Sequence, residues 1–330
     1  MNQVTPQMQQ AQAWSDFWQH GSLTTFFQGS FQTGYDGPVA EFWNAVFDEL
    51  ADGNAMLDLA TGNGAIPYLA AVRAGELGRK WRIVGLDYAH IRPPSDPAIQ
   101  SALAGVELLA GISMEQTGLP EESFDLITSH FGFEYADPLA AGREVRRLLK
   151  PGGQMVLVMH HPESAVVEQA RRDYRQTRRC LFEEQIDRKV LALLEIVGDA
   201  RSSQARARFR QHPQSERLRV DINRSMKRLL DLTRGEDDSQ TMRVAQSFLR
   251  VFADLADRSK SEKMAFVRQS RDSLEAYSRR MQSMARATMD ASSHAAFVGK
   301  MKELGFELMD QSDLEYGSGE LIGRAVRFSG

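Results

Sequence analysis

Two carboxylates stand beside a glycine-rich turn, and one of them could hold a ligand that carries hydroxyl groups. Asp58 lies inside an apolar run that leads into the turn Thr61-Gly62-Asn63-Gly64. Glycines there allow positive φ and let the backbone approach a ligand closely. A helix starting after the turn would point its first amides at the same place. Asp87 ends the next apolar run and could accept hydrogen bonds from both hydroxyls of a ribose.

Five short apolar runs alternate with helical segments between residues 54 and 161. The runs are 55–60, 82–87, 106–110, 124–130 and 154–159. This alternation predicts a parallel β-sheet, and right-handed crossovers would place helices on both of its faces. Open sheets of this kind bind their ligands at the carboxyl ends of the strands.

Histidines gather at the same expected edge of the sheet. His90 follows the second run, His130 ends the fourth, and His160 and His161 end the fifth. An imidazole could take a proton from an oxygen or nitrogen nucleophile there, because it titrates near neutral pH. We expect His161 or His160, before His130, to be the base, although each could be a structural hydrogen-bonding group. A metal site that adds Glu134 to them is the weaker alternative, since no ligand spacing supports it, and we expect no metal.

Four segments stand in a specific order and spacing: 57–64 (LDLATGNG), 85–87 (GLD), 119–125 (LPEESFD) and 149–153 (LKPGG). With these segments the chain resembles the class I S-adenosylmethionine-dependent methyltransferases, whose fold is Rossmann-like. The six-position dinucleotide fingerprint of dehydrogenases is absent, because Pro67 stands where its third glycine would fall.

The resemblance implies a seven-stranded, mostly parallel, doubly wound α/β sheet, with S-adenosyl-L-methionine as cofactor and S-adenosyl-L-homocysteine as product. It implies a cofactor site made of Tyr35, Asp58, Ala60, Gly62, Asn63, Gly64, Asp87, Tyr88, Ile112, Ser113, His130 and Phe131. Ile112 departs from the family, which often has an acid at this place near the adenine. We therefore expect backbone amides and Ser113 to recognise the adenine.

Aromatic residues mark two further places. Tyr35-Asp36 matches a pair that closes over the cofactor in similar enzymes, although Asp36 also begins a simple turn. The segment 131–135 (FGFEY) follows the fourth strand, where related enzymes contact both cofactor and acceptor. The Asn/Asp-Pro-Pro-aromatic motif of nucleic-acid amine methyltransferases is missing from it, which argues against methylation of bases.

The chain divides into four expected parts. They are a helical, aromatic segment at 1–53, a cofactor-binding core at 54–161, a helical insertion at 162–290, and a helix with a strand hairpin at 291–330 that completes the sheet. Within the insertion the expected helices are 163–197, 200–211, 215–233, 238–257 and 260–289. Because it leaves from the carboxyl edge of the sheet, the insertion is expected to be a lid over the acceptor. Its long amphipathic helices need an apolar partner, which favours a homodimer.

Composition narrows the class of protein. The segment 162–290 carries 27 lysines and arginines against 20 acids, a net charge of +7, while the rest carries 13 against 24, a net charge of −11. No apolar run reaches the ~20 residues that span a bilayer, and the polar start of the chain is unlike a secretory signal. A single cysteine, Cys180, cannot form an internal disulfide. These features favour a cytoplasmic protein.

The sequence thus favours a methyltransferase that acts on oxygen or nitrogen of a small molecule, one with an aromatic or apolar part and an anionic group held by arginines. We do not expect nucleic acid as a partner. The alternatives are an RNA or protein methyltransferase that uses the arginine-rich insertion, or a methyltransferase-like scaffold subunit without catalysis.

Overall fold

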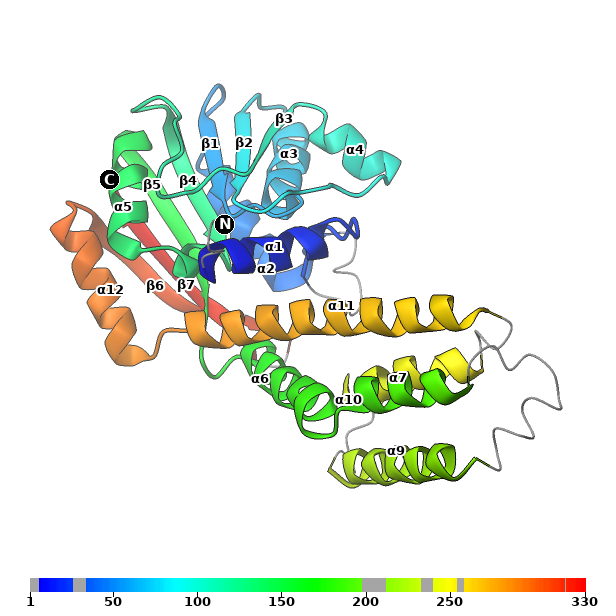
Figure 1. Ribbon diagram of the computed structural model, residues 1–330. Helices are drawn as coiled ribbons and strands as arrows, with labels where there is room; N and C mark the ends of the chain where they lie inside the picture. The colour runs from blue at the N-terminus through cyan, green and yellow to red at the C-terminus, as the bar shows by residue number, and fades with distance from the viewer. Residues whose placement is uncertain (1–5, 26–33, 198–211, 233–239, 254–257, 318) are drawn as a thin grey trace. The chain divides into compact units, whose positions relative to one another are not determined.

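The computed structural model describes residues 6–25, 34–197, 212–232, 240–253, 258–317 and 319–330 (Figure 1). It contains two compact units. The first joins Met1–Glu168 to Ser283–Gly330, and the second is Gln169–Gln282. The expected helix at 200–211 lies outside the described residues. No helix among the described residues is long and apolar enough to cross a membrane.

A seven-stranded sheet with the order β3-β2-β1-β4-β5-β7-β6 forms the centre of the first unit (Figure 1). The strands are β1 (Ala55–Leu59), β2 (Arg82–Asp87), β3 (Val106–Ala110), β4 (Phe124–His130), β5 (Leu149–His160), β6 (Glu307–Tyr316) and β7 (Glu320–Ser329). The first five strands are parallel, and β7 runs antiparallel to both β5 and β6. The predicted fold class is confirmed. The strand order turns back between β1 and β4, which is where open α/β sheets bind ligands.

One strand differs in length from the prediction. β5 begins at Leu149 rather than at 154, because its start already pairs with Phe124 of β4. β6 runs as far as Tyr316, because its antiparallel pairing with β7 persists along its whole length. Leu149 and Leu314 are buried in these strands, whereas most of their neighbours are polar, as residues at a strand start or an edge strand can be.

Helices cover both faces of the sheet. One face packs against α5 (Pro138–Leu148) and α12 (Ala291–Glu303), and the other against α2 (Gly37–Asp48) and α3 (Ala65–Leu77). The shorter helix α4 (Pro97–Leu103) packs beside α3. The fully buried Trp43 and Phe47 of α2 lie in the core, as the helical spacing of apolar residues in 37–50 predicts. α1 (Pro6–Trp18) contributes the small aromatic cluster of Phe17 and Trp18.

The described part of the second unit is helical. Its elements include α7 (Ile186–Val197), α9 (Pro213–Leu232), α10 (Gln240–Leu249) and the greater part of α11 (Lys260–Ala287). The expected helix 163–197 is two helices, because α6 (Ala165–Arg178) ends in a π-helical turn, Arg179–Glu183, followed by Gln185 at positive φ. Cys180 is buried in the apolar core of this unit. Arg271 forms an ion pair with the buried Asp187.

Substitution by alanine is expected to change the free energy of unfolding in opposite directions at Gly323 and at Gly299. A Cβ on Gly323 of β7 would lie 2.7 Å from the carbonyl oxygen of Met159 and 2.8 Å from the ring of Phe131. We expect Gly323→Ala to lower the free energy of unfolding by about 1–3 kcal/mol through overpacking. Gly299 lies inside α12 with no atom within 4 Å of an added Cβ, so Gly299→Ala should raise it by roughly 0.5–1 kcal/mol. Denaturant unfolding of both variants measures the difference, and equal midpoints would contradict it.

Candidate active site

A cavity of about 240 Å³ lies at the carboxyl ends of β1, β2 and β4, with a lining drawn from the first unit. The sequence-predicted residues that line it are Tyr35, Asp58, Ala60, Asp87, Tyr88, Ile112, Ser113, His130, Phe131 and His160. Two of them hold non-glycine backbone in the left-handed region, Ala60 at φ 53° and Phe131 at φ 59°. Such strain costs about 1–3 kcal/mol per residue and gathers at functional sites. It occurs here directly after β1 and β4.

The glycine turn is held from the side by Asp87. The two oxygens of its carboxylate accept hydrogen bonds from the backbone amides of Gly62 and Ala89, each at 2.7 Å. Gly62 has φ 53°, and a Cβ on it would lie 2.4 Å from the indole of Trp18. The ring of Trp18 of α1 therefore occupies the space that a side chain at position 62 would need. Gly62 and Gly64 shape the turn without lining the cavity.

Asn63 points away from the cavity, in contrast to the cofactor contact expected for it. Its amide donates hydrogen bonds to the carbonyl oxygens of Trp18 and Ser22, at 3.0 and 2.7 Å. Its oxygen accepts one from the amide of Arg92 at 2.7 Å. These three hydrogen bonds join the glycine turn to the N-terminal segment and to the chain after β2.

The N-terminal aromatic residues form a wall of the cavity that motif reasoning missed. Trp14 and Trp18 both line it, with ring centroids 6.1 Å apart, and the ring of Trp14 meets that of Tyr135 edge-on at 6.2 Å. The hydroxyl of Ser15 fixes α1 by accepting a hydrogen bond from the amide of His90 at 2.9 Å. Only the density of aromatic residues in 1–53 hints at this wall. Tyr35 also lines the cavity, whereas Asp36 accepts a hydrogen bond from the hydroxyl of Tyr316.

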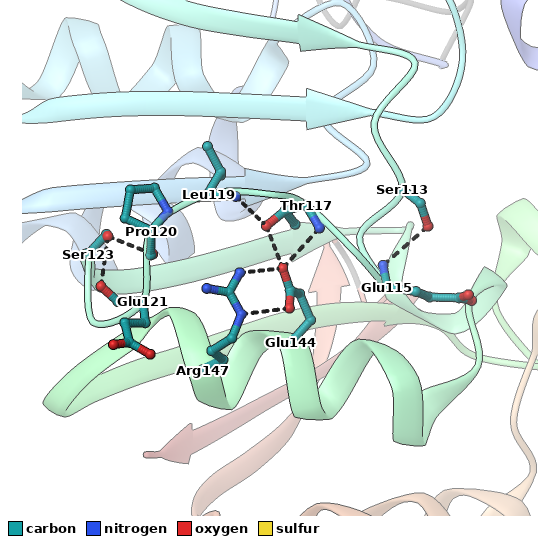
Figure 2. Close-up of polar contacts among 9 residues, drawn as sticks. All are labelled: Ser113, Glu115, Thr117, Leu119, Pro120, Glu121, Ser123, Glu144 and Arg147. Carbon is teal, nitrogen blue, oxygen red and sulfur yellow. Dashed lines mark hydrogen bonds and ion pairs between the residues drawn. The ribbon is translucent and has the colours of Figure 1, made fainter.

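A loop after β3 supplies a further wall, and α5 holds that loop in place (Figure 2). The carboxylate of Glu144 accepts hydrogen bonds from the amide and the hydroxyl of Thr117, at 2.9 and 2.6 Å. It is also paired with Arg147, which lowers the pKa of Glu144 to about 2. Ser113 Oγ accepts a hydrogen bond from the amide of Glu115 at 3.2 Å, which closes a small turn at the cavity.

An acid does stand on this loop, three residues beyond the place that the resemblance indicates. Glu115 lines the cavity, and its Oε1 accepts a hydrogen bond from the amide of Asp137 at 2.9 Å. Ile112 contributes an apolar contact instead. Glu115 was not predicted, because the resemblance indicates an acid directly after the strand, before the turn at Ser113.

Two buried carboxylates without a basic partner dominate the electrostatics of the cavity. Burial raises the pKa of the Asp58 carboxyl to about 7 and that of the Asp87 carboxyl to about 6. Asp58 accepts a hydrogen bond from the hydroxyl of Thr128 at 2.7 Å, and no ion pair to either acid occurs among the described residues. The described lining includes three acids and neither lysine nor arginine.

These buried carboxylates fit S-adenosylmethionine. The cofactor has a cationic sulfonium, an ammonium group and two ribose hydroxyls, which complement buried carboxylates that lack counter-charges. Asp58 is placed to attract the cationic end, and Asp87 retains lone pairs for hydroxyl groups beyond its two amide bonds. Among the described residues, no group of three or more His, Cys, Asp or Glu is arranged to hold a metal ion.

His160 and Glu134 form a buried pair on the other side of the cavity. Glu134 Oε1 accepts hydrogen bonds from His160 Nδ1 at 2.6 Å and from the amide of the same histidine at 2.8 Å. The carboxylate therefore fixes the proton on Nδ1 and leaves the lone pair on Nε2. The ring of Phe131 stacks on the imidazole at 4.3 Å. This is the arrangement of a base with an orienting carboxylate.

The other two candidate bases are placed differently. His130 Nδ1 accepts a hydrogen bond from Trp43 Nε1 at 3.0 Å, so its proton is on Nε2. Burial, and then the neighbouring His160, lowers the pKa of His130 to about 3, and with Nδ1 bonded to Trp43 and the proton on Nε2 the ring has no free lone pair for a base. His161 Nδ1 accepts a hydrogen bond from the amide of Glu163, and His161 does not line the cavity. Of the two adjacent candidates, His160 and not His161 therefore lines the cavity.

Part of the chain is similar to known proteins. A family profile described as a methyltransferase domain matches residues 57–157. The chain is 36% identical over 135 residues to the 2-phytyl-1,4-naphtoquinone methyltransferase of Thermosynechococcus vestitus, covering 39% of this chain and 56% of the relative. It is 31% identical over 109 residues to the demethylmenaquinone methyltransferase of Listeria monocytogenes, covering 32% and 44%.

A solved S-adenosylmethionine-dependent methyltransferase from Mesorhizobium loti is 27% identical, with a TM-score of 0.29 and coverage of 38% of this chain and 56% of that one. The chain spans about half the length of the curated relatives it matches. Its core is a class I, S-adenosylmethionine-dependent methyltransferase domain, as the four motifs predicted.

Asp87 provides the first test of the cofactor site. We expect Asp87→Asn to weaken S-adenosylmethionine binding by about 1.5–3 kcal/mol, the worth of hydrogen bonds to a charged group. Calorimetry gives the dissociation constant, and circular dichroism confirms folding, because Asp87 also holds the turn. Asp310→Asn, on the exposed edge strand β6, is the matched control. An unchanged affinity in folded Asp87→Asn removes this residue from the site.

The raised pKa values predict how cofactor binding depends on pH. A cation binds the ionised carboxylates better than the protonated ones, so binding should release protons that Asp58 and Asp87 hold in the free protein. Affinity should therefore rise from about pH 5 to 7 and level off above that range. Calorimetry in buffers of different ionisation enthalpy measures the released protons. Asp58→Asn should flatten the upper part of the curve, and a flat wild-type curve contradicts the assignment.

Proposed function

We propose that the chain is an S-adenosylmethionine-dependent methyltransferase that acts on a small molecule. The single observation that carries this proposal is one cavity with unpaired carboxylates on one side and the His160–Glu134 pair on the other. The first side suits a cationic methyl donor, and the second suits removal of a proton from the acceptor. When bound, the cofactor supplies a methyl group on a sulfonium, which needs little covalent help from a protein.

The work left to the chain is alignment, exclusion of water and management of one proton. His160 Nε2 takes the acceptor proton, while Glu134 keeps the imidazole oriented and stabilises the imidazolium that forms. The aromatic rings of Trp14, Phe131 and Tyr135 give the cavity an apolar wall that suits an acceptor with an aromatic part. Transfer to oxygen or nitrogen is chemically open to such a site. Both relatives are named for quinone acceptors, and a quinone-like acceptor also suits this wall.

Two alternatives have less support. A nucleic acid needs basic side chains along its phosphates, and the described lining has no lysine or arginine. A non-catalytic scaffold would need neither the two buried acids nor the oriented histidine. For the helical unit 169–282 we propose a role as a lid and a homodimer contact, supported by its amphipathic helices. A monomer at micromolar concentration in analytical ultracentrifugation would contradict the dimer.

The base is tested by three variants of one design. His160→Gln and Glu134→Gln should each lower turnover roughly 10²–10⁴-fold, the usual contribution of a general base. Cofactor affinity should stay near that of wild type, because no hydrogen bond joins either residue to Asp58 or Asp87. His161→Gln, beside the pair but outside the cavity, should keep turnover within a few-fold. The assay uses isotope-labelled S-adenosylmethionine with a metabolite extract and follows the labelled product.

If His160→Gln and Glu134→Gln both keep wild-type turnover, the acceptor loses its proton to another group or needs no base.

A further inference from the structure

His130 and His160 share one cavity but carry their protons on different nitrogens. Glu134 holds a proton on Nδ1 of His160, whereas Trp43 donates to Nδ1 of His130 and so forces the proton of that ring onto Nε2. Trp43 is fully buried in the core, so this hydrogen bond has no competition from water. His130 Nε2 is buried, and no described residue accepts a hydrogen bond from it. A buried donor without a partner costs about 1–3 kcal/mol, and a ligand would remove that cost.

We propose that His130 is a fixed, neutral hydrogen-bond donor to the oxygen of the methyl acceptor, and that the acceptor is therefore a phenol or an enol. This inference rests on the proposed methyl transfer and names the substrate class of the same site. Trp43 acts as a positioning residue through His130. The role differs from that of a base, since His130 offers a proton in a hydrogen bond and does not accept one.

The pairing of a base with a neutral donor selects oxygen over nitrogen. An amine that loses a proton as it is methylated ends neutral, and a donor directed at its nitrogen would compete for the electron pair that must attack. A phenol or enol that gives its proton to His160 becomes an oxyanion, and an N–H donor stabilises that charge. The described lining has no cation for this purpose, which leaves the task to neutral donors. The hydroxyl of Tyr135 is a second buried donor without a partner among the described residues.

The step balances as follows. The acceptor O–H bond breaks, its proton binds Nε2 of His160, and its electron pair stays on oxygen. That pair, or the conjugated pair on the neighbouring carbon, forms the new bond to the methyl carbon. The carbon–sulfur bond of the donor breaks, and its electron pair neutralises the sulfonium. Transfer to carbon requires loss of that carbon's hydrogen as a proton afterwards, whereas transfer to oxygen does not.

The first experiment reads ionisation of a bound probe and needs no turnover. 4-Nitrophenol changes its absorbance on ionisation, so a pH titration with the full chain reports the pKa of the bound phenol. We expect this pKa to be lower in wild type than in His130→Phe, with His130→Gln in between because its amide retains an N–H donor. His161→Gln should match wild type. Absence of binding to wild type, or the same pKa in wild type and folded His130→Phe, overturns the proposal.

The second experiment separates this inference from the proposed function. Labelled S-adenosylmethionine is offered with a panel of phenols, naphthols and hydroquinones and with the matching anilines. We expect label in the oxygen compounds only, and a loss of roughly 10²–10³-fold in kcat/KM in His130→Phe with unchanged cofactor affinity. Label in the anilines alone overturns the inference but keeps the methyltransferase. Absence of cofactor binding to wild type overturns the proposed function itself. Weaker cofactor binding in His130→Phe means that His130 donates its hydrogen bond to the cofactor, which overturns the inference.

The tautomer can be observed directly. In protein labelled with ¹⁵N-histidine, His130 should stay neutral with its proton on Nε2 from about pH 5 to 8. A proton on Nδ1, or protonation within this range, removes the fixed donor. Trp43→Phe should give a mixture of tautomers, a change that a purely structural role for Trp43 does not require.

Discussion

Two carboxylates buried without a counter-ion set the character of this protein's cavity. Moving an unpaired charge out of water is costly, and Asp58 and Asp87 respond with pKa values raised to about 7 and 6. The surrounding backbone lowers that cost in part, because the amides of Gly62 and Ala89 bind Asp87. A bound cation would lower it further. The glycine turn, the switch in strand order and the absence of basic lining side chains in the described structure all serve a cationic, hydroxyl-bearing molecule.

The opposite side of the cavity obeys a different constraint, that of proton position. Two histidines of the same intrinsic chemistry receive different partners, a carboxylate for His160 and an indole N–H for His130. One ring therefore exposes a lone pair and the other an N–H. Packing enforces the difference, since Trp43 and Glu134 are themselves buried. Phe131, held at positive φ, lies between the two imidazoles at a centroid distance of 4.3 Å from each.

The strands show how much of the fold the pattern of apolar residues predicts. The parallel strands β1 to β4 were predicted within a residue or so, because buried parallel strands are continuous apolar runs bounded by turns. β5 was predicted too short, since residues 150–153 (KPGG) have the composition of a turn rather than of a strand. Of the residues that line the cavity, Asp87 and His160 were predicted from their places at strand ends, and Asp58 from its place inside the strand before the glycine turn. Trp14, Trp18 and Glu115 were not, because they reach the cavity from a helix and a loop whose docking has no local signature.

The sequence by itself determined the sheet, the glycine turn and the identity of the acids, since hydrophobic periodicity and glycine conformation act over a few neighbouring residues. Only the tertiary structure decided which side chain does what. Asn63 became a hydrogen-bonding partner of α1, His161 was left outside the cavity, and His130 became a donor. Each outcome depends on a partner distant in sequence, and a proton's place on an imidazole follows from that partner. No local pattern encodes such a contact, so the fold must form before the chemistry of the site is defined.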